Sequence, residues 1–304
     1  MQIAVIGMGT MGPGIAARLA RGGHGVAAHD VKEAAMDRAR GQMNAVDGVL
    51  DALEIGDDGG TVEFFDSLEE AVANADLIIE NVPENAELKA ELYGALAPLV
   101  APDSLVATDT SGISITKLQS HIVNPERFVG MHWSNPPHII PMIEVIAGEQ
   151  TARATVDAIS DLIRGLGLIP VVLKRDMPGF VENRVLYALL RECVELVEQG
   201  AIDPDDLDTC VKWGIGYKLS VIGPMRLLDM AGLDIYGSVA SFLNAELCNR
   251  SDVSRLVTAA TEEGRLGMKS GAGIFDYTEK ELRELPLARG AKLVAIRKIL
   301  EGRN

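Results

Sequence analysis

The sequence feature that most constrains the fold is a glycine-rich turn close to the N-terminus. A short apolar run at residues 2–6 predicts a buried strand, and the turn that follows it reads Gly7-Met8-Gly9-Thr10-Met11-Gly12. Residues 15–20 then predict a helix, and a second apolar run at residues 26–28 leads to Asp30. This order of strand, glycine turn, helix, strand and acid predicts a dinucleotide-binding site.

Each glycine of the turn has a predicted role. Gly7 allows the tight turn out of the strand, Gly9 lets a pyrophosphate approach the backbone, and Gly12 lets the helix pack closely on the strand. The N-terminus of the helix offers free N–H groups to the phosphates. A carboxylate at Asp30 accepts both ribose hydroxyls and repels a 2′-phosphate, which favours NAD over NADP, although Lys32 weakens this preference. The predicted cofactor contacts in this stretch are Gly7, Gly9, Thr10, Met11, Gly12 and Asp30.

Length and charge limit the classes of protein to which this chain can belong. With 304 residues, the chain is long enough for two domains. Its formal net charge of −16 argues against nucleic acid and anionic membranes as partners. We find no apolar run of membrane-spanning length and no signal peptide. Three widely spaced cysteines, Cys193, Cys210 and Cys248, are expected to be buried free thiols in a reducing cytoplasm, so the predicted location is cytoplasmic.

The pattern of strands and helices changes along the chain. Predicted strands and helices alternate as far as residues 169–173, which indicates a mostly parallel sheet covered on both faces. From Pro178 onward the periodicity is helical. We therefore predict an α/β fold: an N-terminal Rossmann-type NAD-binding domain with a mostly parallel sheet at residues 1–176, and a second, all-helical C-terminal domain for substrate binding at residues 177–304.

His132 is the strongest candidate for a catalytic residue. It closes an apolar strand, and Glu144 lies twelve residues later inside another apolar run. A buried carboxylate requires a partner, and a histidine that it orients becomes a general base near neutral pH. The residues alone are equally consistent with a structural hydrogen bond between His132 and Glu144 that has no part in chemistry.

Two other polar residues have weaker local signals. Ser111 follows a strand end and suits a hydrogen bond to a substrate oxygen, but on the residues alone a helix cap is the favoured role. Asn183 lies early in the first helix of the second domain, where most polar residues are simply solvated. No set of histidines and carboxylates has metal-ligand spacing in the sequence, so no metal is predicted.

Several motifs in the same order resemble the 3-hydroxyacyl-CoA dehydrogenase family. They are the glycine turn, Glu84-Asn85 with Lys89, Thr110-Ser111, the stretch from Gly130 to Pro136 that contains His132, and the stretch from Pro178 to Arg184. The resemblance implies that His132 is the general base and that Glu144 orients it. It further implies that Ser111 and Asn183 hold the reacting oxygen and the cofactor region. Glu84, Lys89 and Asn135 would lie near the ribose and nicotinamide, and the helical domain would form a homodimer.

The chain departs from that family pattern at the surface that would meet CoA. Residues 42–60 contain no Lys or Arg, but they contain five acids, which would repel the negative charges of CoA. Trp133 and Ser134 also replace a more apolar pair. In these departures the chain resembles a member of the family that oxidises a small aromatic aldehyde acid. A 3-hydroxyacyl-CoA dehydrogenase and a non-catalytic NAD-binding or structural protein are the alternatives. The complete set of Ser111, His132, Glu144 and Asn183 argues against the second alternative.

Overall fold

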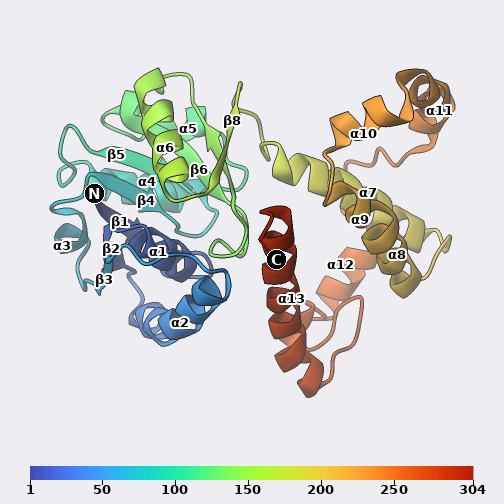
Figure 1. The fold of residues 1–304 in the computed structure, drawn as a ribbon, viewed down its shortest axis with the longest axis horizontal. Coiled ribbons are helices and arrows are strands. Elements are labelled where there is room, and N and C mark those ends of the chain that lie inside the picture. Colours follow the sequence, from blue (N-terminus) through green and yellow to red (C-terminus); the bar gives the residue numbers. More distant parts are fainter. Residues whose placement is uncertain (304) are drawn as a thin grey trace. The chain divides into compact units, whose positions relative to one another are not determined.

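The computed structural model describes residues 1–303, which form two compact units. The first unit comprises Met1–Arg184 and the second begins at Val185 (Figure 1). This division falls inside helix α7 (Glu182–Glu198), because the first turn of α7 belongs to the N-terminal unit. The boundary between residues 176 and 177 that the sequence predicts lies just before this helix, and it stays a prediction.

An eight-stranded sheet forms the centre of the N-terminal unit, in the order β3-β2-β1-β4-β5-β6-β7-β8. The strands are β1 (Gln2–Ile6), β2 (Gly25–His29), β3 (Thr61–Phe64), β4 (Leu77–Glu80), β5 (Leu105–Thr108), β6 (Phe128–Trp133), β7 (Met142–Ile146) and β8 (Ile169–Leu173). Every neighbouring pair is parallel except β6 and β7, which are antiparallel. The predicted α/β class with a mostly parallel sheet is therefore confirmed.

Helices cover both faces of this sheet. Side chains along each strand point alternately to opposite faces, so each face has its own apolar cluster, which the helices cover. Ile3 and Val5 of β1 belong to one apolar cluster, whereas Ala4 and Ile6 belong to the other. The first cluster contains residues of α1 (Gly12–Arg21), α2 (Glu33–Ala52) and α6 (Arg153–Gly165). The second contains residues of α3 (Leu68–Val72), α4 (Ala86–Leu96) and α5 (Ile115–Gln119).

Helix caps test the local predictions directly. Ser67 caps α3, because its side chain accepts a hydrogen bond from the N–H of Glu70. The favoured role of Ser111 as a helix cap is wrong, because Ser114 caps α5 and accepts the N–H of Lys117. Asp203 stands at the N-cap of α8 (Pro204–Cys210), but its side chain makes no capping hydrogen bond.

The second unit is helical, as the sequence predicts. Its further helices are a π-helical turn at Val211–Gly216, α9 (Tyr217–Leu219), α10 (Pro224–Ala231), α11 (Leu233–Glu246), α12 (Arg255–Glu262) and α13 (Glu279–Leu300). None of the large apolar side chains of residues 185–303 is buried. The expectation of buried thiols is wrong, because Cys210 is exposed and Cys193 and Cys248 are only half-buried. Among the described residues, no helix is long and apolar enough to span a membrane.

Candidate active site

The site is built around the one antiparallel contact of the sheet. His132 of β6 lies directly opposite Glu144 of β7, and its Nδ1 lies 2.9 Å from Oε2 of that carboxylate. The other oxygen of Glu144 accepts the backbone N–H groups of Val181 at 2.9 Å and Glu182 at 3.1 Å. Burial opposes the charge, but these three hydrogen bonds outweigh it and hold the pKa of Glu144 below its usual value. The carboxylate therefore stays ionised and fixes the imidazole.

His132 is buried and surrounded by negative charge. Burial alone would lower the pKa of its imidazole, but the hydrogen bond to Glu144 and the charges of Glu144 and Glu182 raise the pKa above its usual value. Its Nε2 makes no hydrogen bond within the described chain, which leaves that nitrogen for proton exchange with a substrate. This geometry suits a general base with an orienting carboxylate.

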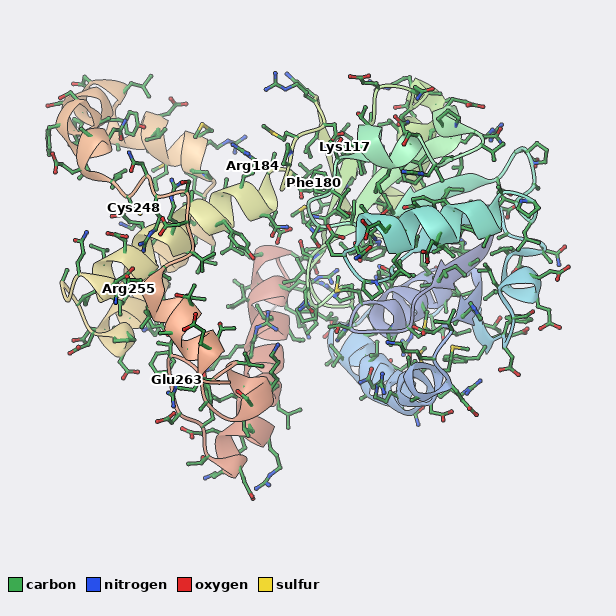
Figure 2. All side chains as sticks on the ribbon, turned by 180° about the vertical axis from the view of Figure 1, so that it is seen from behind. Lys117, Phe180, Arg184, Cys248, Arg255 and Glu263 are labelled. Carbon is green, nitrogen blue, oxygen red and sulfur yellow. The ribbon has the colours of Figure 1, made fainter. Side chains whose placement is uncertain are left out.

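The segment that carries these N–H groups has an unusual backbone. Phe180 adopts a φ of +51° although it is not glycine, and its side chain is fully buried. The phenyl ring packs against the imidazole of His132 with centroids 5.6 Å apart. Phe180 and Arg184 frame this segment at the start of α7 in Figure 2. Residues in the left-handed region cost energy and occur where surrounding packing fixes them, which agrees with a functional position.

Ser111 is positioned by two predicted site residues. Oε1 of Glu84 accepts the N–H groups of Ser111, Gly112 and Ile113 at 3.1, 2.9 and 3.3 Å. From the other side, Nδ2 of Asn183 donates to the carbonyl of Ser111 at 2.9 Å. The hydroxyl of Ser111 makes no hydrogen bond within the described chain, so it remains free for a ligand oxygen. The structure thus brings Ser111, Asn183 and Glu84 together.

Lys89 forms a buried ion pair at the end of β4, and its Nζ also lies 3.8 Å from Oε2 of Glu84. Its Nζ is buried and lies 2.6 Å from Oε1 of Glu80, a fully buried carboxylate at the end of β4. The other oxygen of Glu80 accepts the hydroxyls of Tyr93 at 2.8 Å and Thr108 at 2.7 Å. Glu80, paired with Lys89, therefore joins the ends of β4 and β5, and any contact of Lys89 with a ribose or nicotinamide stays a prediction.

The glycine turn has the shape that a dinucleotide requires. A Cβ on Gly7 would lie 2.6 Å from the carbonyl oxygen of Asn81, and one on Gly12 would lie 2.2 Å from that of Gly7. A Cβ on Gly9 would meet no protein atom within 4 Å, so the space above that residue is open. Oδ2 of Asp30 accepts the N–H of Met8 at 2.8 Å, which holds the acid beside the turn.

Two further observations show that NAD fits this turn. Met11 is the N-cap of α1 and supplies no side-chain cap, so the first N–H groups of the helix are available to phosphates. Both polar atoms of the Asn81 amide are buried without a hydrogen-bond partner in the described chain, next to Gly7. Of the remaining predicted contacts, Thr10 is exposed beside the open space, and Asn135 lies two residues after the end of β6.

Sequence reasoning missed three polar residues of the site. Asp109 follows β5 and accepts the N–H of Trp133 at 2.7 Å. Ser134 donates a hydrogen bond to the carboxylate of Glu182, whose charge acts on His132. The signals were available, because Asp109 ends a buried strand and Ser134 interrupts an apolar stretch, but pairing Ser134 with Glu182 requires the fold.

The fold also gathers donor atoms that are dispersed in the sequence. One polar atom each of His132, Glu144 and Glu182 lies within 4.8 Å of the others. The Nδ1 of His132 is already bonded to Glu144, which is the arrangement of a proton-transfer site rather than an open metal site. That no metal is required stays a prediction.

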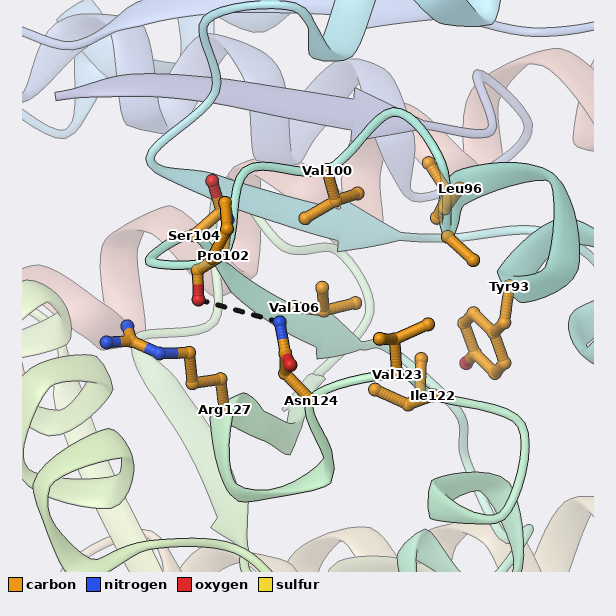
Figure 3. Close-up of a pocket in the computed structure, with 11 residues that line it drawn as sticks. Tyr93, Leu96, Val100, Pro102, Ser104, Val106, Ile122, Val123, Asn124 and Arg127 are labelled. Carbon is orange, nitrogen blue, oxygen red and sulfur yellow. Dashed lines mark hydrogen bonds between the residues drawn. The ribbon is translucent and has the colours of Figure 1, made fainter.

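A cavity of about 220 Å³ lies elsewhere in the N-terminal unit (Figure 3). Ser104 and Val106 at the amino end of β5 line it, together with Leu96 of α4, Ile122 and Arg127. Ligands of open α/β sheets bind at the carboxyl ends of the strands, where His132 and Ser111 lie. This cavity is therefore separate from the catalytic residues.

Comparison with known proteins agrees with this geometry. Residues 2–177 match the family model of the 3-hydroxyacyl-CoA dehydrogenase NAD-binding domain, and residues 179–277 match that of the 3-hydroxyacyl-CoA dehydrogenase C-terminal domain. The chain belongs to the 3-hydroxyacyl-CoA dehydrogenase family. The predicted family, NAD as cofactor and the enzyme class of dehydrogenase are confirmed.

Within this family, individual relatives differ widely in their similarity. The chain is 64% identical to 5-formyl-3-hydroxy-2-methylpyridine 4-carboxylate 5-dehydrogenase of Mesorhizobium japonicum, covering 100% of this chain and 99% of that protein. A crystal structure of an enzyme of that name, described as an NAD⁺-dependent dismutase, matches with a TM-score of 0.98 and 63% identity over 100% of this chain and 99% of the other. A probable 3-hydroxybutyryl-CoA dehydrogenase of Deinococcus radiodurans is 34% identical, over 91% of this chain and all of that protein.

Proposed function

We propose that this protein oxidises the hydrated aldehyde of 5-formyl-3-hydroxy-2-methylpyridine-4-carboxylate to the 4,5-dicarboxylate with NAD, in vitamin B6 degradation. We also propose that it catalyses dismutation of the same aldehyde to acid and alcohol. The observation that carries the proposal is the full-length 64% identity to an enzyme of that name. The complete His132, Glu144, Ser111 and Asn183 arrangement supports it.

The residues of the site suit a hydrated aldehyde. A gem-diol has the C–H and O–H groups of an alcohol, so it presents the same reacting groups as a 3-hydroxyacyl substrate. Bound NAD supplies the hydride acceptor. Nε2 of His132 accepts the hydroxyl proton, while Glu144 holds Nδ1 and stabilises the imidazolium. Ser111, fixed by Glu84 and Asn183, donates its hydroxyl to a substrate oxygen.

The alternative is a true 3-hydroxyacyl-CoA dehydrogenase, and the acid-rich stretch at residues 42–60, from the C-terminal half of α2 into the loop after it, argues against it. Two of the five acids in residues 42–60 pair with Arg21, whose Nη2 lies 2.7 Å from Asp51 and whose Nε lies 3.4 Å from Asp47. The other three acids are exposed, and the stretch has no basic residue. Their charge would oppose the phosphates of CoA.

Initial rates with purified protein separate these two functions. We expect NADH formation with NAD and the pyridine aldehyde acid, and no NADH consumption with acetoacetyl-CoA. Turnover of the CoA ester alone would favour the alternative. Turnover of neither substrate, with NAD still bound, would favour the non-catalytic NAD-binding class.

We further propose a homodimer formed by the helical unit. Large apolar side chains such as Trp213, Tyr217, Met230 and Phe242 are at least 62% exposed in the single chain. Exposed apolar area on this scale marks a protein interface. Sedimentation should therefore give twice the mass of one chain, and a monomer would contradict the proposal.

The three free thiols support our proposal of a cytoplasmic location.

A further inference from the structure

A pair of polar residues lies beside the catalytic histidine and has no part in the mechanism above. The hydroxyl of Ser134, two residues after His132, donates to Oε2 of Glu182 at the start of α7. The backbone N–H of Glu182 donates to Oε1 of Glu144 at 3.1 Å. The backbone of Glu182 is thus hydrogen-bonded to Glu144, the carboxylate that orients His132. Its side chain is hydrogen-bonded to Ser134, which follows the strand that carries His132.

The carboxylate of Glu182 is close enough to act on the imidazole. A carboxylate oxygen of Glu182, one of Glu144 and a ring nitrogen of His132 all lie within 4.8 Å of one another. The other groups that face His132 are Asp109 after β5 and the apolar ring of Phe180. In a buried site, a second carboxylate at this distance stabilises the protonated imidazole appreciably.

We propose that Glu182, held in place by Ser134, is a positioning residue that retains the proton on His132 between the oxidative and the reductive half of a dismutation. The inference rests on the proposed function, because it concerns the second half of that same reaction. It assigns to the Ser134 and Glu182 pair a role that plain oxidation does not require.

The proton balance shows why retention matters. In the first half, the gem-diol loses a hydride and a hydroxyl proton and becomes the carboxylic acid, and His132 takes the proton. In the second half, a new aldehyde gains the same hydride at carbon and a proton at oxygen, giving the alcohol. Two aldehydes and one water thus yield one acid and one alcohol. If His132 loses its proton to water in between, the second half lacks its acid.

The sign of the Glu182 effect follows from its charge. Removing a negative charge makes protonated His132 less stable, so its pKa falls. In Glu182→Gln the acid limb of the oxidation rate should move to lower pH by about one unit, since one unit is a tenfold change in the protonation equilibrium. At a pH above the lowered pKa, His132 of the variant loses its proton to water before the reductive half more often than His132 of the wild-type does. The ratio of acid to alcohol product should then rise by up to about tenfold.

Matched variants separate this role from a structural one. Glu182→Asp keeps the charge and should keep a product ratio closer to that of the wild-type than Glu182→Gln does. Ser134→Ala frees the carboxylate and should shift the ratio in the same direction as Glu182→Gln, by less. Glu149→Gln removes an exposed charge from the loop after β7, and it should leave the ratio unchanged. Equal ratios in wild-type, Glu182→Gln and Ser134→Ala would overturn the proposal.

A second readout does not depend on turnover. The imidazole of His132 can be titrated by NMR in the full-length protein, with its signal assigned by its loss in His132→Gln. We expect the pKa of His132 to fall in Glu182→Gln and to stay unchanged in Glu149→Gln. An unchanged titration in Glu182→Gln would overturn the role of Glu182, whereas failure of the wild-type to act on the aldehyde would overturn the proposed function.

Discussion

Nδ1 of His132 lies 2.9 Å from Oε2 of Glu144, and the two residues are directly opposed in the antiparallel ladder of β6 and β7. Twelve residues of sequence separate them, but the ladder places their side chains on the same face of the sheet. The register of two strands therefore determines the geometry of the general base. One carboxylate oxygen orients the ring while the other is anchored by the backbone ahead of α7.

Replacing His132 by Gln should abolish turnover and leave NAD affinity unchanged. Glutamine retains a hydrogen-bonding group but cannot accept the substrate proton at neutral pH, so kcat should fall by about 10²- to 10⁴-fold. Initial rates measure the first effect, and quenching of protein fluorescence by NADH measures the second. Persistent turnover with intact NADH binding would show that another group is the base.

Glu84→Ala should impair catalysis by releasing the loop that carries Ser111. One oxygen of Glu84 accepts three backbone N–H groups of that loop, and alanine removes all three bonds. Because small misplacements of reacting groups are costly, kcat should fall by about tenfold to 100-fold. Glu87→Ala, three residues later in the first turn of α4, is the control and should behave as wild-type. A normal kcat in Glu84→Ala would contradict this role.

Lys89→Met should destabilise the fold more than a typical substitution, since it leaves Glu80 charged and fully buried. Removing one partner of a buried ion pair costs about 3–5 kcal/mol of the free energy of unfolding. Adding Glu80→Gln to Lys89→Met should recover part of that loss. Urea unfolding of the single and double variants measures both effects, with Lys117→Met as an exposed control. Equal stability of Lys89→Met and Lys117→Met would show that the pair is unimportant.

Asp109→Asn should stabilise the protein increasingly as the pH rises. Burial raises the pKa of Asp109 to about 8, despite the N–H of Trp133. The folded state therefore keeps a proton that the unfolded chain releases, so wild-type stability falls from the usual carboxyl range near pH 4 up to about pH 8. Asparagine does not titrate and can still accept the N–H of Trp133. The gap in thermal midpoint between variant and wild-type should grow over this window and level off above it; a constant gap would contradict the shift.

The sequence was informative wherever one residue pattern determines one local structure. The strands, the glycine turn and the pair of His132 and Glu144 follow from apolar runs and from the cost of burying a carboxylate. The roles of Lys89 and Glu182 did not follow, because each depends on a partner brought close only by tertiary packing: Glu80 for Lys89, and Ser134 for Glu182. Ser111 shows the limit of local rules, since Ser114, three residues later, satisfies the same capping pattern.

The glycine turn allows cofactor binding to be separated from folding. A Cβ on Gly9 would meet no protein atom within 4 Å, whereas one on Gly12 would lie 2.2 Å from the carbonyl oxygen of Gly7. Gly9→Ala should therefore keep the thermal midpoint of the wild-type but weaken NAD binding, because its methyl group occupies the space predicted for the pyrophosphate. Gly12→Ala should lower both, since the helix must move away from the strand. Calorimetric titration with NAD and thermal unfolding measure the two quantities. Unchanged NAD affinity in Gly9→Ala would place the pyrophosphate elsewhere.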